Sequence, residues 1–241
     1  MELTRILHRY ILLSVIVLGL EYWQLTFISI VQLKLSCLFV MCLFLDYFSP
    51  KLHVVTYYTT PVILLKNINV IFYVMINYSL FDYCLYYTLH NSNYELNVTN
   101  IIGNYILSLP IAFLSSFLFY YIHRLLHTEY FYFLHKLHHE YNHPSSFVAL
   151  YSSIPDFVLS NCIPIFLPHL ILGTQRSFIV GYSFIAIYDI FVNHTSYSFN
   201  NLILNVFFGG SHFHYVHHSK FQYNYGLNNK FFDKLHKTLF V

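Results

Sequence analysis

The chain has 241 residues, of which 57% are hydrophobic, 21% aromatic and only 9% charged, and its formal net charge is +2. A soluble domain carries roughly 25% charged residues, so this composition excludes an ordinary soluble protein as well as a disordered one. The small net charge leaves no basic surface or tail for nucleic acid. Since the mean hydropathy is +0.53, we expect an integral membrane protein of one compact unit.

Five apolar regions follow one another along the chain, and a membrane-spanning helix needs about 20 such residues. The first region is long enough for one span and part of a second. It lacks the small-residue cleavage site of a signal peptide, so we expect a retained anchor. The fourth contains three prolines, which predict a broken or re-entrant element. The regions are Tyr10–Phe48, Pro61–Leu85, Asn104–Ile122, Phe147–Leu172 and Phe178–Val192.

The distribution of Lys and Arg predicts the orientation in the membrane. Half of the 12 basic residues lie beside the histidine-rich stretches 123–143 and 212–218, and the positive-inside rule places that side in the cytosol. The segment His90–Asn100 has no Lys or Arg and carries the sequon Asn97-Val98-Thr99, which agrees with the opposite side. The last two apolar regions must then form a hairpin that turns near Gly173–Arg176. The six basic residues are Arg124, Lys136, Lys220, Lys230, Lys234 and Lys237.

Histidine is concentrated in the sequence, because ten of its 16 copies fall within those two stretches, where uniform scatter would place about two. Residues i, i+3 and i+4 share one face of a helix, so each motif should present its imidazoles together. Imidazole is the commonest protein metal ligand. Eight donors exceed the about four to six that one ion needs, which predicts two ions. The motifs are His123-Arg-Leu-Leu-His127, His135-Lys-Leu-His138-His139 and His214-Tyr-Val-His217-His218.

Carboxylates are scarce around these motifs. Only Glu129 and Glu140 lie near the first two, and none lies within residues 190–232. A ferritin-type site needs Glu from several helices, and a zinc hydrolase of the H-E-x-x-H kind needs Glu after the first His, so both are excluded. Imidazole suits iron, copper, zinc and nickel, and the ligands alone leave the metal open. The four cysteines form no C-x-x-C pair and are expected to be buried apolar residues.

The remaining histidines are weighed singly. His194 falls at the cytosolic end of the last apolar region, where it is either an interfacial polar residue or a ninth ligand; we favour the ligand. His143 is expected in a loop and His212 at an exposed or second-sphere position, and a ligand role stays open for both. Asp189, one helical turn before Asn193, either orients the His194 region or caps the helix. No ligand role is expected for His8, His53, His90, His169 and His236.

The motifs and their flanks resemble the fatty acid hydroxylase / sterol desaturase superfamily of membrane di-iron enzymes, whose pattern is H-x3-H, H-x2-H-H and, after a long apolar interval, H-x2-H-H. Four segments are most similar to sterol C-4 methyl oxidase and cholesterol 25-hydroxylase: HRLLHTEYFYFLHKLHHEYNHP (123–144), NHTSY (193–197), GGSHFHYVHHSKFQYNYG (209–226) and FFDKLHKT (231–238). The resemblance covers about residues 105–240. No histidine of the three motifs is lost. The chain departs from the family pattern at several positions. Phe213 replaces a frequent His, Tyr215 an Asp, Ser196 a Gly and Phe232 a Trp, and His236-Lys237-Thr238 stands where the family has F/L-G-T.

The resemblance implies an all-α integral membrane protein of transmembrane helical hairpins, with a cytosolic histidine-rich helical cap that holds a dinuclear metal site. Residues 1–103 would form an N-terminal transmembrane region and 104–241 the catalytic domain. Two non-haem irons would use dioxygen, with electrons from NAD(P)H through cytochrome b5 and its reductase, to hydroxylate or desaturate a sterol or other lipid in the endoplasmic reticulum. The implied ligands are His123, His127, His135, His138, His139, His194, His214, His217 and His218.

A second hypothesis is a membrane metal transporter or metal-binding protein that uses the same histidines. It requires acidic residues or histidines within the spans. From Asn104 onward the spans contain only Asp156, His169 and Asp189, which favours the oxygenase.

Overall fold

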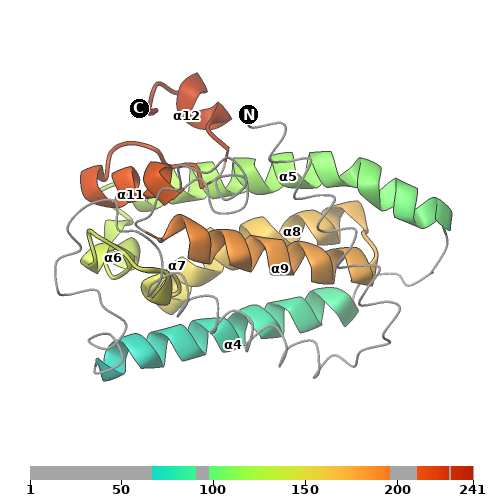
Figure 1. Ribbon diagram of the computed structural model, residues 1–241, viewed down its shortest axis with the longest axis horizontal. Helices are drawn as coiled ribbons and strands as arrows, with labels where there is room; N and C mark the ends of the chain where they lie inside the picture. Colours follow the sequence, from blue (N-terminus) through green and yellow to red (C-terminus); the bar gives the residue numbers. More distant parts are fainter. Residues whose placement is uncertain (1–66, 91–97, 196–210, 228, 241) are drawn as a thin grey trace.

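The computed structural model describes residues 67–90, 98–195, 211–227 and 229–240. Within these segments every regular element is helical, which confirms the predicted fold class (Figure 1). The first apolar region, His8 and His53 lie outside the described residues. The helices are α4 (Ile68–His90), α5 (Val98–Leu126), α6 (Tyr132–His135), α7 (Ile154–Phe157), α8 (Ile163–Leu172), α9 (Arg176–Asn193), α11 (Ser211–Lys220) and α12 (Phe231–Leu235), with 3-10 turns η2 (His138–Glu140) and η3 (Ser146–Val148) and a π turn η4 (Val158–Cys162).

Three helical segments are long and apolar enough to cross a membrane: Ile68–His90, Ile106–Leu126 and Ile154–Leu172; Phe178–Asn193 is a shorter apolar helix. Helices α4, α5, α8 and α9 run side by side along the long axis of the molecule (Figure 1). Large apolar side chains remain exposed on α4 and α5, as expected where lipid replaces water as the solvent. The chain is therefore an integral membrane protein, as its composition predicts.

The proline-rich fourth region forms a continuous helix with a π turn in it, and not a break. Pro155 stands in the first turn of α7, where the missing N–H costs no helical hydrogen bond, and Pro164 is the second residue after the π turn. Ser153 caps α7 by accepting a hydrogen bond from the N–H of Asp156 at 3.3 Å. Between the two helices, η4 widens the backbone spiral by one residue per turn. The predicted irregularity is thus present in a form that still allows the segment to span.

A tight turn joins α8 to α9 at the predicted hairpin. Gly173 ends α8 with φ +64°, a left-handed conformation in which glycine carries no steric penalty. The Nδ1 of His169 lies 2.7 Å from the Oγ1 of Thr174, which links the last turn of α8 to the connection. Because the two helices are antiparallel, α9 returns to the end of the bundle from which α7 starts (Figure 1).

The main core lies where α4, α8 and α9 pack together, around Phe81, Phe157 and Ile187. A buried amide fastens α4 to the connection before α7: the Nδ2 of Asn77 donates to the carbonyl oxygens of Leu150 and Ser152 at 2.9 and 2.8 Å. Helix α5 packs on α8 from the other side. The expected division between residues 1–103 and 104–241 falls inside α5 and stays a prediction.

Candidate metal centre

The predicted histidines meet at one end of the bundle. Four segments carry them: the end of α5, the α6–η2 segment, the end of α9 and helix α11. Figure 1 shows α6 and α11 at the same end of the molecule, beside the last turns of α5 and α9. The spans therefore place the imidazoles at the boundary of the apolar bundle.

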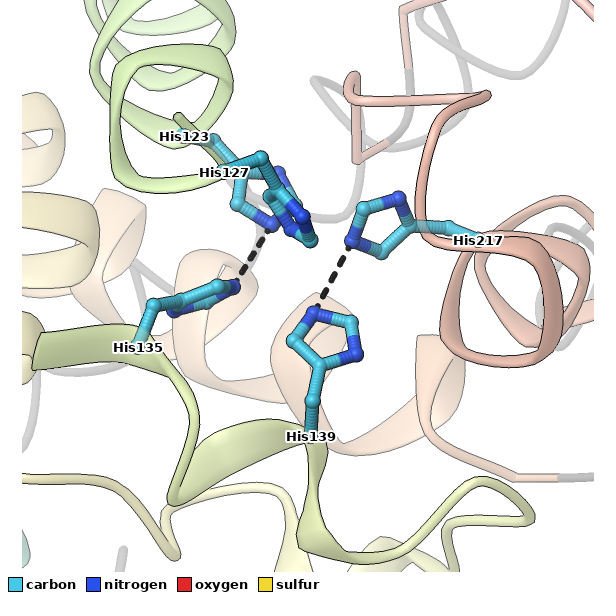
Figure 2. A group of neighbouring side chains, drawn as sticks. All are labelled: His123, His127, His135, His139 and His217. Carbon is cyan, nitrogen blue, oxygen red and sulfur yellow. Dashed lines mark hydrogen bonds between the residues drawn. The ribbon is translucent and has the colours of Figure 1, made fainter. Parts of the chain in front are cut away.

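The nine side chains form two groups, and within each group the potential ligand nitrogens all lie within 4.8 Å of one another. Figure 2 shows the first group, in which rings from α5, the α6–η2 segment and α11 point toward a common centre. The groups adjoin, because the His139 and His218 rings are 4.5 Å apart. The five-histidine group is His123, His127, His135, His139 and His217, and the four-histidine group is His138, His194, His214 and His218.

Hydrogen bonds fix the tautomer of three rings in the five-histidine group. The Nδ1 of His123 lies 2.7 Å from the carbonyl oxygen of Tyr225, and that of His217 lies 2.8 Å from the carbonyl oxygen of Tyr223. The Nδ1 of His135 lies 2.9 Å from Oδ1 of the buried Asp156. A carbonyl or carboxylate oxygen only accepts, so each Nδ1 carries the hydrogen and each Nε2 presents a lone pair.

The four-histidine group repeats this arrangement. The Nδ1 of His194 donates to the carbonyl oxygen of Ile190 at 2.7 Å, and that of His138 to the carbonyl oxygen of Tyr151 at 3.3 Å. Both rings therefore also direct an unprotonated Nε2 into the group. Outer-sphere contacts of this kind are typical of metal-binding histidines.

In each histidine group, two unprotonated Nε2 atoms direct their lone pairs at each other at short range. The Nε2 atoms of His123 and His135 are 3.1 Å apart, and so are those of His138 and His194. With both hydrogens on Nδ1, neither contact is a hydrogen bond, and two acceptors at this distance repel. A cation between them removes the repulsion. Two ligands at right angles, each about 2.1 Å from one ion, lie about 3.0 Å apart, so the donor set of each group fits a metal.

Burial keeps these imidazoles neutral. It lowers the pKa of His127 to about 2, with a further contribution from the neighbouring His135 and His138. Burial, followed by the charge of His138, lowers the pKa of His194 to about 3. In the same way burial and adjacent histidines hold the pKa values of His139 and His214 well below the usual 6.5. Neutral imidazole is the form that coordinates a metal.

Comparison with known proteins identifies the family. Residues 108–238, more than half of the chain, match the family model described as fatty acid hydroxylase. The chain belongs to the fatty acid hydroxylase family. All nine histidines lie within the matched residues.

The curated relatives are longer proteins. Fatty acid hydroxylase domain-containing protein 2 of Homo sapiens is 33% identical over 122 residues, and that of Macaca fascicularis is 34% identical over 122 residues. Each match covers 50% of this chain and 34% of the relative, so the chain matches about a third of the relatives' length. No solved structure matches.

In this fatty acid hydroxylase family member, the C-terminal segment holds two of the histidines in place. The buried carboxylate of Asp233 accepts hydrogen bonds from the N–H groups of Tyr225 and Gly226 at 2.9 and 2.8 Å. It also accepts one from the hydroxyl of Thr238 at 2.8 Å. These contacts fix the backbone that supplies the carbonyl groups of Tyr223 and Tyr225 to His217 and His123.

Sequence reasoning did not identify Asp156, Asp233 or the backbone carbonyls as supports of the site. A lone acid in an apolar, proline-rich stretch is a signal that could have singled out Asp156, because intramembrane acids are usually functional. Asp233 carries no signal of its own beyond its place in the segment FFDKLHKT (231–238). A backbone carbonyl has no residue signature at all. The carbonyl oxygen of Ile190 orients His194, and the two alternatives for Asp189 stay predictions.

The remaining described histidines stay outside both groups. The Nδ1 of His143 lies 2.8 Å from the hydroxyl of Tyr215, and the two rings stack. His212 is exposed, and His90 and His236 contact tyrosine hydroxyls on neighbouring turns or helices. His169 lies near the end of α8. The expectation that His90, His169 and His236 are not ligands stays a prediction, and the roles of His143 and His212 stay open.

Proposed function

We propose that the chain is a membrane-bound di-iron oxygenase that hydroxylates or desaturates an unactivated C–H bond of a sterol or other lipid. The observation that carries this proposal is the facing pair of unprotonated Nε2 atoms in each histidine group. Membership of the fatty acid hydroxylase family supports an oxidoreductase that acts on lipids, and it favours iron among the metals that imidazole binds.

The two groups would each hold one ion. His123, His127, His135, His139 and His217 would bind the first, and His138, His194, His214 and His218 the second. Bound iron would supply the redox chemistry by which dioxygen attacks a C–H bond. With five and four histidine ligands, each ion would keep a coordination position for dioxygen if it accepts about six ligands.

The protein's own residues prepare the site. Asp156 and the carbonyl oxygens of Tyr223 and Tyr225 hold the proton on Nδ1 of three histidines. Each Nε2 is thereby kept free for the metal and fixed in direction. Because the groups lie at the ends of the apolar helices, a lipid substrate would approach them from the bilayer.

Electrons would come from NAD(P)H through cytochrome b5 and its reductase. Lys136, Lys220, Lys234 and Lys237 are exposed on the segments that surround the histidines, and their charge would attract an acidic redox partner. The same lysines support a cytosolic orientation of this end under the positive-inside rule, and an endoplasmic reticulum location is part of the proposal.

Lipid analysis of a yeast strain that lacks a sterol or lipid oxidase tests the proposal. Wild-type protein should produce a new hydroxylated or unsaturated lipid, and growth under 18O2 should label a hydroxylated product. His217→Ala, expressed at the same level, should produce none. Identical lipid profiles for the wild type and His217→Ala would contradict the proposed activity.

A further inference from the structure

We propose, on the basis of the oxygenase function above, that a cavity beside the metal centre receives a hydrogen-bond-donating neutral group of the substrate, an alcohol or an amide N–H, and disfavours a carboxylate or phosphate. The cavity has a volume of about 100 Å³ and lies between α5, η4, α8, α9 and the segment after Tyr225. Its polar lining consists of Ser116, Ser160, Asn161, Tyr182, Asp189 and Asn229.

The cavity is in direct contact with the supports of both histidine groups. Phe119 lines it and packs on the His123 ring at 5.0 Å. Ile190 lines it and accepts the hydrogen bond of His194. Gly226 lines it next to Tyr225, whose carbonyl oxygen holds His123. A group bound in the cavity therefore places its neighbouring carbons close to the histidines.

Three hydroxyl groups that line the cavity already donate a hydrogen bond within the protein. Ser116 donates to the carbonyl oxygen of Ala112 at 2.7 Å, and Ser160 to that of Asp156 at 2.8 Å. The hydroxyl of Tyr182 donates to Ser115 at 2.9 Å. These three hydroxyl groups can therefore only accept a hydrogen bond from a ligand. The side-chain amides of Asn161 and Asn229 also line the cavity and can donate, so the selection against an anion rests on the charges of the lining.

The charges of the lining point in the same direction. Among the described residues around the cavity none is Lys, Arg or His, and the one carboxyl group belongs to Asp189. Burying an anion costs several kcal/mol unless it is paired or hydrogen-bonded, and a carboxylate only accepts hydrogen bonds. A lipid alcohol or amide, in contrast, can donate to the serine oxygens or to Asp189.

The volume limits how much of the lipid enters. A cavity of about 150 Å³ holds one benzene molecule, so this one takes the polar group and a few carbons. The rest of the lipid must lie outside it. The cavity would then select the substrate by its polar group.

Native mass spectrometry of the detergent-purified, metal-loaded protein tests the inference with three probes of equal chain length: hexadecanol, hexadecanamide and hexadecanoate. At a mildly alkaline pH the alcohol and the amide should bind at least about tenfold more tightly than the acid, since one hydrogen bond is worth about that factor. Equal or tighter binding of hexadecanoate would overturn the inference.

A pair of serine variants localises the effect. Ser116→Ala removes an acceptor from the cavity and should weaken hexadecanol binding several-fold with unchanged metal content. Ser79→Ala is the matched control, because the Ser79 hydroxyl donates to the i−4 carbonyl of Met75 on the exposed side of α4. Unchanged binding in Ser116→Ala, or an equal loss in Ser79→Ala, would contradict the assignment. Binding without any oxidised product would refute the proposed function and leave this inference standing.

Discussion

Replacing Asp233 with alanine should weaken the metal centre from a distance. Its carboxylate accepts three hydrogen bonds, from Tyr225, Gly226 and Thr238. The backbone fixed in this way supplies carbonyl oxygens to the Nδ1 atoms of His123 and His217. Both histidines belong to the five-histidine group, so that group should be affected and the four-histidine group spared.

The size of the effect follows from the number of donors left unpaired. Each buried donor without a partner costs roughly 1–3 kcal/mol, so Asp233→Ala should lower the free energy of unfolding by on the order of 3 kcal/mol or more. Loss of an outer-sphere partner typically costs about 10–100-fold in metal affinity. Asp233→Asn keeps one acceptor oxygen and should lie between the wild type and the alanine variant.

Two measurements on detergent-purified protein test this prediction: thermal unfolding and metal retention during titration with a chelator. Lys234→Ala is the control, because Lys234 is exposed on the same short helix. Asp233→Ala should unfold at a lower temperature and lose one metal equivalent at a lower chelator concentration. If Asp233→Ala and Lys234→Ala behave alike in both measurements, the C-terminal segment does not support the site.

Three further predictions concern the histidines themselves. Asp156→Ala should lower metal affinity about 10–100-fold in chelator competition because His135 loses its partner; an unchanged affinity would argue against this role. His217→Ala and His218→Ala should each reduce metal content from two ions to about one by elemental analysis, and loss of all metal in both would show that the groups are not independent. In the metal-free protein, the lowered pKa values of His127 and His194, about 2 and about 3, mean that the unfolded state binds more protons below about pH 6.5. Stability should therefore be complete above that pH and fall as the pH drops toward 3, and a flat unfolding temperature between pH 7 and 4 would contradict the burial of neutral rings.

The metal centre was predictable from sequence because the chemistry is in the side chains. Spacing by three and four residues places histidines on one face of a helical turn. His138 and His139 also point into the metal centre, although they lie in a 3-10 turn. The excess of donors over the needs of one ion predicted two groups. His194 followed from the topology, since the end of α9 had to return to the same side as the first motifs.

The supports of the site were less predictable. The carbonyl groups of Tyr223 and Tyr225 depend on the path of the backbone, and no residue type encodes it. The fourth apolar region stays helical through a π turn, with Pro164 and Pro168 in the helix that follows it, although prolines alone suggest a break. The hydroxyl groups of the cavity act as acceptors because Ser116 and Ser160 donate to backbone carbonyls one turn away and Tyr182 donates to Ser115 on another helix, which only the folded helices reveal.

The central claim is that the nine histidines hold two iron ions in two adjoining groups. Anomalous X-ray diffraction at the iron absorption edge, from protein produced in iron-replete cells, tests it most directly. The account predicts two peaks, one surrounded by the five-histidine group and the other by the four-histidine group. A single peak, or peaks away from these imidazoles, would contradict it.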